Sequence, residues 1–213
     1  MTYATSERFA PFDLGDRNFF LLILAAIWAY ILAGFAPDIF DHVSGKHVAY
    51  ALVVHIHAVV FVGWLALLTT QMSLIRAGRA DLHRRLGLAG GALIPAMAVL
   101  GPWTVLVMAH REFGTPDGDA AFIILPFLNI LNFTVVASAG LALRRTPAAH
   151  KRLMILATVL ISDAGFARWL GGPIAKLTGT GVLPFFVQNY TGTVILIAAM
   201  AAWKPIATAL IGR

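Results

Sequence analysis

Long apolar runs separated by short polar segments dominate the chain. Six of these runs approach or exceed the roughly 18–20 residues that an α-helix needs to cross a bilayer. They cover residues 19–36, 49–75, 86–109, 120–143, 153–172 and 190–211. The pattern predicts an all-α fold, in which six transmembrane helices form a bundle and residues 1–213 make a single integral membrane domain.

Composition also indicates a protein that lies in a lipid bilayer. Hydrophobic residues make up 59% of the chain and charged residues 12%, roughly half the charged fraction of an ordinary soluble domain. The mean hydropathy is +0.81, so the lipid bilayer is the expected surrounding. Cysteine is absent, which excludes disulfides, thiolate metal sites and cysteine nucleophiles.

Basic residues gather in two of the five loops, while each of the other loops holds a single Lys or Arg. The two basic loops carry Arg76, Arg79, Arg84 and Arg85 between the second and third runs, and Arg144, Arg145, Lys151 and Arg152 between the fourth and fifth. Short basic loops stay on the cytoplasmic side. We therefore expect a bacterial inner-membrane protein with both termini in the cytoplasm. The net charge of +6 reflects this topology, and no basic stretch is interleaved with aromatics as nucleic-acid binding would require.

A weak internal repeat connects the two basic loops. The sequence LHRRLG at residues 82–87 returns as AHKRLM at residues 149–154, 67 positions later. The same offset places the second run on the fourth, so the repeat predicts two related helical hairpins, spans 2–3 and 4–5, as the core of the bundle. The first and last spans would then be more peripheral. Chance similarity between two basic loops is the alternative.

Polar side chains recur in the outer half of the predicted spans, when depth is counted at about 1.5 Å per residue. They are His57, Asn129, Asn132, Asp163 and Arg168. Polar groups are costly in hydrocarbon and usually turn toward the bundle interior. We expect these residues, with His57, Asn129 and Asp163 on three helices and Arg168 at the border, to line one cavity that binds a cofactor or substrate. A hydrogen-bonded network that only locks the helices together, including an Asp163–Arg168 ion pair, is the structural alternative.

The second run contains two histidines one residue apart. His55 and His57 point roughly 200° apart on a helix, so only one of them can face a given interior site. We favour His57, because Trp64 follows it at helical spacing and could extend the same site. His55 is a candidate copper or zinc ligand together with the loop residues His42 and His47. The spacing of these histidines matches no fixed ligand signature, so ordinary solvated histidines are the alternative.

A second histidine layer lies at the predicted cytoplasmic ends. His83 and His150 occupy equivalent repeat positions, each at the start of a rising span and each followed by two basic residues. If the two spans meet, these imidazoles could hold a metal ion or the two axial positions of a haem b, with arginines near the propionates. Interfacial anchoring is the alternative.

The second to fifth spans resemble an uncharacterised family of bacterial multi-pass inner-membrane proteins, a domain of unknown function that implies no activity. The resemblance is carried by His57-x3-Phe61-x2-Trp64, Gln71, Leu82-His83-Arg84-Arg85-Leu86-Gly87, His150-Lys151-Arg152-Leu153-Met154 and Arg168. A looser likeness links the chain to small oxidase-assembly membrane proteins and to four-helix membrane cytochromes b. Those cytochromes hold haem between histidines on facing helices, whereas the outer histidines here share one helix. The likeness therefore implies at most one haem or a metal ion.

Three classes of function stay open. The leading one is a redox-linked membrane protein that binds haem, a metal ion or quinone within its bundle. The others are a small-molecule or proton carrier, and a non-catalytic subunit or assembly factor of a respiratory or photosynthetic complex. No hydrolase triad, phosphate loop, HExxH or dinucleotide fingerprint occurs. The sequence leaves open whether the protein is an enzyme and whether it forms a homo-oligomer.

Overall fold

The computed structural model describes residues 14–46, 49–115 and 123–211, with side chains omitted at 14–17, 112 and 204–211. The described residues form helices and turns and contain no strand. The helices are α1 (Leu14–Val43), α2 (Leu52–Arg76), α3 (Ala80–Glu112), α4 (Ile124–Ala142), α5 (Pro147–Leu160), α6 (Asp163–Phe166), the π-helical turn η2 (Ala167–Gly171), α7 (Gly172–Thr178) and α8 (Val182–Ile211). The predicted all-α fold is confirmed.

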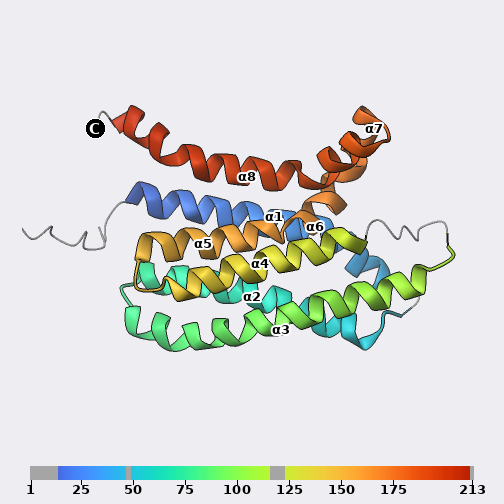
Figure 1. Cartoon of the computed structure of the whole chain (residues 1–213), viewed down its shortest axis with the longest axis horizontal. Helices are drawn as coiled ribbons and strands as arrows, with labels where there is room; N and C mark the ends of the chain where they lie inside the picture. Colours follow the sequence, from blue (N-terminus) through green and yellow to red (C-terminus); the bar gives the residue numbers. More distant parts are fainter. Residues whose placement is uncertain (1–13, 47–48, 116–122, 212–213) are drawn as a thin grey trace, which may run out of the picture.

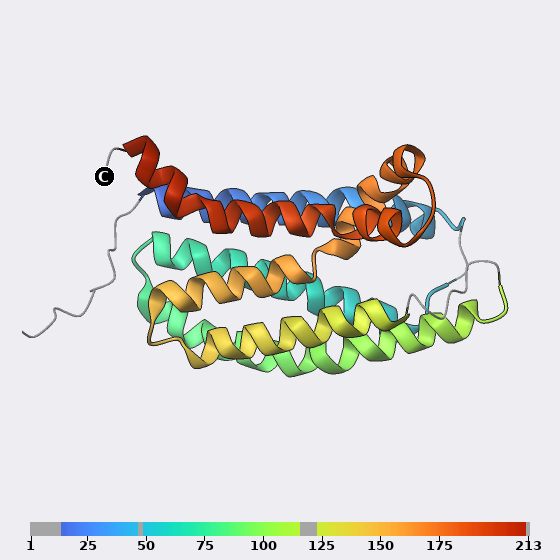
Figure 2. The same cartoon turned by 45° about the horizontal axis from the view of Figure 1, so that its top comes forward.

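Six helical segments are long and apolar enough to cross a membrane, as predicted. The fifth segment in chain order, Pro147–Thr178, combines α5, α6, η2 and α7, and each of the other segments is a single helix. The long helices lie side by side, and α5 lies between the α1/α8 pair and the α3/α4 pair (Figures 1 and 2). The outside of the bundle is apolar, with side chains such as Val59 and Leu88 exposed by 72% and 80%. An apolar exterior of this kind suits lipid and not water.

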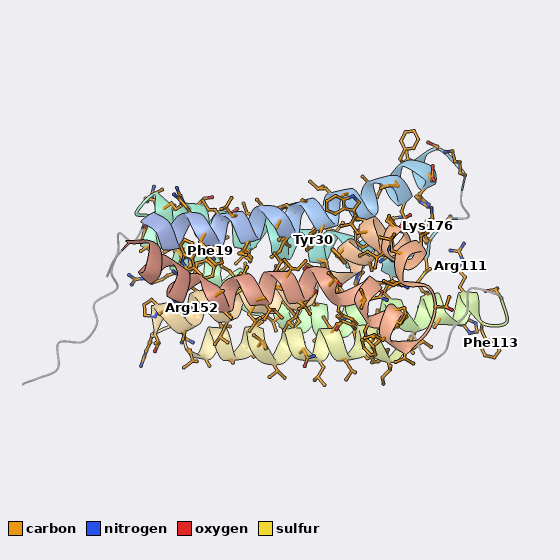
Figure 3. All side chains as sticks on the ribbon, turned by 90° about the horizontal axis from the view of Figure 1, so that it is seen from above. Phe19, Tyr30, Arg111, Phe113, Arg152 and Lys176 are labelled. Atoms are coloured by element: carbon orange, nitrogen blue, oxygen red, sulfur yellow. The ribbon has the colours of Figure 1, made fainter. Side chains whose placement is uncertain are left out.

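The two ends of the bundle differ in charge. The α2–α3 and α4–α5 turns lie at one end together with the start of α1 and the end of α8 (Figure 1). We call this the basic end, because the two basic loops form it; Arg152 lies there, whereas Arg111 and Lys176 lie at the opposite end (Figure 3). The side of the membrane that each end faces stays a prediction.

The interior consists of two apolar clusters. One joins the two hairpins, α2–α3 and α4–α5, through Trp64, Ile94, Met97, Ile130, Phe133, Ala137 and Ala157. The other joins α1 to α2, α5 and α8 through Phe20, Ile23, Leu24, Ile27, Leu65, Leu68, Ile155, Val159 and Leu196. The expectation that the first span is peripheral is therefore wrong. Its buried residues form one helical stripe, which packs into the core.

The fifth span is broken, although the sequence predicted one helix over residues 153–172. α5 ends at Leu160, where the backbone N–H groups of Ile161 and Ser162 donate to the carbonyls of Thr158 and Val159 three residues back. Such tight bonds close a helix end. The chain then restarts as α6 and continues through η2. No proline lies at the break, so hydropathy and helix-breaker residues gave no sign of it.

Glycines let the short α6 pack closely between α1 and α8. A methyl group added at Gly165 would lie 2.6 Å from the backbone oxygen of Tyr30, and one added at Gly34 would overlap the Gly165 backbone. On the other side, a methyl group at Gly192 of α8 would overlap the Phe166 ring. Neighbouring helices thus hold the broken segment on both sides.

The segment between the predicted fifth and sixth spans, residues 173–189, is largely helical. α7 covers its first part, and α8 begins at Val182 instead of residue 190. Only residues 179–181 connect them, with positive φ angles at Gly179 and Gly181. The earlier start of α8 brings additional polar residues into the bundle.

Candidate functional site

A buried carboxyl group lies at the break in the fifth span. Asp163, the first residue of α6, is only 9% exposed. Asn129 Nδ2 of α4 donates a hydrogen bond to Asp163 Oδ2 at 2.5 Å, and the Ala164 backbone N–H lies beside the carboxyl group. A carboxyl group removed from water requires such partners. The structure thus brings together two of the predicted site residues.

Tyr190 of α8 completes this group. Its side chain lies close to both Asn129 and Asp163. We call these three residues the carboxyl cluster. Sequence reasoning missed Tyr190 because a tyrosine at the expected start of the last span resembles an interfacial anchor. The early start of α8 places it inside a helix.

Arg168 does not pair with Asp163. Its Nε lies 3.4 Å from Asp38 Oδ2 of α1, its Nη1 donates to the Ala164 carbonyl, and its guanidinium covers the Phe35 ring. The Asp163–Arg168 ion pair, which the structural alternative included, is not formed. Residues five apart on a helix lie on different faces, so the arginine turns to α1 while the carboxyl group turns to α4.

His57 points into the bundle, whereas His55 is exposed, as the sequence analysis favoured. The His57 ring is directed toward α3. It stacks on Phe61 with centroids 3.9 Å apart and lies beside the Leu100 backbone carbonyl. Its Nδ1 is buried and has no hydrogen-bond partner among the described residues. No hydrogen bond described in the structure joins His57 to Asp163, and the shared cavity for the four residues stays a prediction.

Two other predicted site residues have different surroundings. Trp64 is a core residue, 2% exposed, whose indole Nε1 donates to Thr158 Oγ1 at 3.1 Å. Asn132 lies exposed on α4, one turn from Asn129 but roughly 60° around the helix. Neither contributes a free polar group to the carboxyl cluster.

The histidines at the end of the bundle opposite the basic end are only partly described. His55 is exposed, with its ring 5.7 Å from that of His42 and its Nδ1 3.3 Å from the Ala51 carbonyl oxygen. His47 lies outside the described residues. Within the part of the chain that the structure describes, no three His, Cys, Asp or Glu side chains are grouped to hold a metal ion. The copper or zinc site proposed for this end stays a prediction.

His83 and His150, the second histidine layer, are neighbours at the basic end. The ring centroids of His83 on α3 and His150 on α5 lie 6.3 Å apart, with ring planes at 83°. His150 Nδ1 lies 2.7 Å from the Gly140 carbonyl oxygen. Repeat-equivalent positions are thus neighbours in space.

Among the described residues, two polar centres bring predicted site residues together: the carboxyl cluster at the broken span and the histidine pair at the basic end. The first combines an ionisable carboxyl group with an amide and a phenol, which suits proton exchange. The second offers imidazole nitrogens. Comparison of the chain with family models, with characterised proteins and with solved structures found no match.

Proposed function

We propose that this protein is a proton-coupled carrier for a small solute, located in a bacterial inner membrane with its basic end toward the cytoplasm. The observation that carries the proposal is Asp163, a buried carboxyl group at the break of a membrane-spanning helix. Ionisable groups inside membrane spans commonly serve as proton relays. Broken spans near mid-membrane recur at the binding sites of secondary transporters.

The carboxyl cluster provides the chemistry. Asp163 accepts one proton to become a neutral acid and releases it to become a carboxylate. Asn129 donates to the carboxylate form, and the Tyr190 hydroxyl can donate or accept. In the carrier, the partners stabilise both protonation states, while the close packing of α6 against α1 and α8 connects the protonation of Asp163 to the position of the broken segment.

Proton uptake into liposomes tests this function. The purified protein is reconstituted around a trapped pH-sensitive dye, and an inward proton gradient is applied with weak acids, amines or sugars as probe solutes. One probe class should speed acidification by the wild type. Asp163→Asn, which keeps the shape of the side chain, should acidify like empty liposomes. Asp38→Asn, which changes the exposed partner of Arg168, should behave like the wild type.

Two outcomes would contradict the carrier. One is wild-type acidification no faster than that of empty liposomes with every probe class. The other is equal rates in the wild type and Asp163→Asn. Gel filtration and thermal unfolding of each variant in detergent show whether a lost rate reflects a lost fold.

The redox-linked class keeps one specific observation in its favour, the pairing of His83 and His150 across two helices. Haem between them would produce a Soret absorption band in the purified protein, and extraction with organic solvent would release any bound quinone. The third class, a subunit or assembly factor, predicts a partner protein that co-purifies after gentle detergent extraction.

A further inference from the structure

Polar residues from three helices lie near one another at the basic end. Besides His83 on α3 and His150 on α5, the group includes Gln71 of α2, whose backbone carbonyl lies beside the His83 ring. Its side-chain Nε2 would lie 3.7 Å from a methyl group added at Gly87, one turn beyond His83. The Gln71 carboxamide therefore lies along the face of α3 that carries His83.

Each histidine keeps one ring nitrogen with a free lone pair. His150 Nδ1 lies 2.7 Å from the Gly140 carbonyl oxygen. A carbonyl only accepts, so Nδ1 must carry the proton and Nε2 the lone pair. His83 Nδ1 is buried with no partner among the described residues. With the His83 N–H directed to the Gln71 carbonyl, its lone pair lies on Nδ1. A backbone carbonyl that fixes the tautomer is the usual arrangement behind a metal-bound histidine.

Gln71 adds a third acceptor. Its Oε1 is buried and, like His83 Nδ1, has no partner in the described part of the chain. Buried polar atoms are nearly always hydrogen-bonded or bound to an ion or water. Two such atoms at the end of the bundle where His83 and His150 are neighbours point to a ligand that accepts lone pairs.

We propose that His83, His150 and Gln71 bind a divalent first-row transition metal ion, with Zn²⁺ as the representative. Imidazole nitrogen suits Zn²⁺, Cu²⁺ and Ni²⁺, and a carboxamide oxygen can complete the set. With metal–nitrogen bonds of about 2 Å, the ring centres of two imidazoles on one tetrahedral ion lie roughly 5 Å apart. The ring centres of His83 and His150 lie 6.3 Å apart, so the two side chains would close by about 1 Å around the ion.

The third acceptor favours an ion over a haem. A haem supplies four equatorial nitrogens and needs only two axial ligands, so it would leave Gln71 Oε1 unexplained. Arg84, which follows His83, carries a positive charge nearby, but its side chain is exposed and its charge is screened by solvent. The ion site does not depend on the carrier function, because it lies at the other polar centre.

Zinc titration of the full-length protein tests the site. The protein is purified in detergent with a histidine-free affinity tag and titrated with Zn²⁺ in a calorimeter. We expect one ion per chain and a loss of affinity of at least about tenfold in His83→Ala and in His150→Ala, with a smaller loss in Gln71→Ala. His110→Ala, an exposed histidine at the opposite end, is the matched control and should bind as the wild type. Asp163→Asn should also bind normally.

Either of two results would overturn the site: no zinc binding by the wild type, or unchanged affinity in both histidine variants. If the histidine variants do not fold, X-ray absorption at the zinc edge of the wild type decides. Scattering from two imidazoles supports the site, and scattering from fewer contradicts it. Because Asp163→Asn keeps the zinc site, failure of the metal proposal and failure of the carrier proposal are distinguishable.

Discussion

A single helical turn separates a half-buried asparagine from an exposed one. Asn129 donates to Asp163 inside the bundle, whereas Asn132 lies on the outside of the same helix. The two residues have the same chemistry and nearly the same depth. Helix rotation alone decides which of them can support a proton-binding carboxyl group.

We predict that Asn129→Ala lowers both stability and transport. Loss of a hydrogen bond to a charged group typically costs about 1.5–3 kcal/mol, and the Asp163 carboxylate would lose its amide partner. Asn132→Ala should change stability by less than about 0.5 kcal/mol, as surface substitutions usually do. Thermal unfolding in detergent and proton uptake into liposomes measure the two effects. Equal behaviour of the two variants would contradict the assigned role of Asn129.

At the level of helices, the break in the fifth span depends on contacts with other helices. The backbones of α6 and α1 are in close contact at Gly165 and Gly34. Next to this contact, Tyr30 packs on Phe166 with ring centroids 5.2 Å apart. Small residues allow membrane helices to approach this closely. The position of Asp163 is thus determined by packing on both sides of α6.

Gly165→Ala should destabilise the protein and reduce transport. The added methyl group would meet the backbone of Tyr30 and Ile31, which cannot rotate away, and overpacking typically costs about 1–3 kcal/mol. Gly63→Ala in α2 is the control: nothing lies within 4 Å of the added methyl group, and helix propensity favours alanine by up to about 1 kcal/mol. The unfolding temperature should fall in the first variant and hold or rise in the second. An unchanged temperature for Gly165→Ala would show that α1 can move away without cost.

For the whole molecule, the two ends of the bundle define its orientation. Both basic loops lie at one end, and loops rich in Lys and Arg stay in the cytoplasm. The carboxyl cluster and the histidine pair lie in different parts of the bundle, so proton exchange and metal binding would take place at separate depths of the membrane.

Cysteine labelling should place the basic end in the cytoplasm. The chain has no cysteine of its own, so each introduced cysteine is unique. Arg79→Cys and Arg145→Cys should react with a membrane-impermeant maleimide in inside-out vesicles. Lys46→Cys and Lys176→Cys should react in spheroplasts. Arg79→Cys and Arg145→Cys reacting from opposite sides would contradict the fold, and both reacting from outside would reverse the orientation.

The sequence by itself determined the fold class and the number of spans, because length and hydropathy are local properties that bilayer thickness makes decisive. It also identified Asn129 and Asp163 as partners at similar depth, and His83 and His150 as equivalent positions. These predictions required only counting along helices.

Only the tertiary structure decided how the helices are rotated and where the fifth one breaks. In a membrane span nearly every face is apolar, so the hydrophobic pattern does not specify which side turns inward. For this reason the sequence offered Asp163 as an alternative partner of Arg168, which pairs with Asp38 in the structure, and gave no sign of Tyr190. The choice among hydrogen-bond partners depends on contacts between helices, such as those of Gly34 and Gly192 with α6, and such contacts are not readable from local patterns.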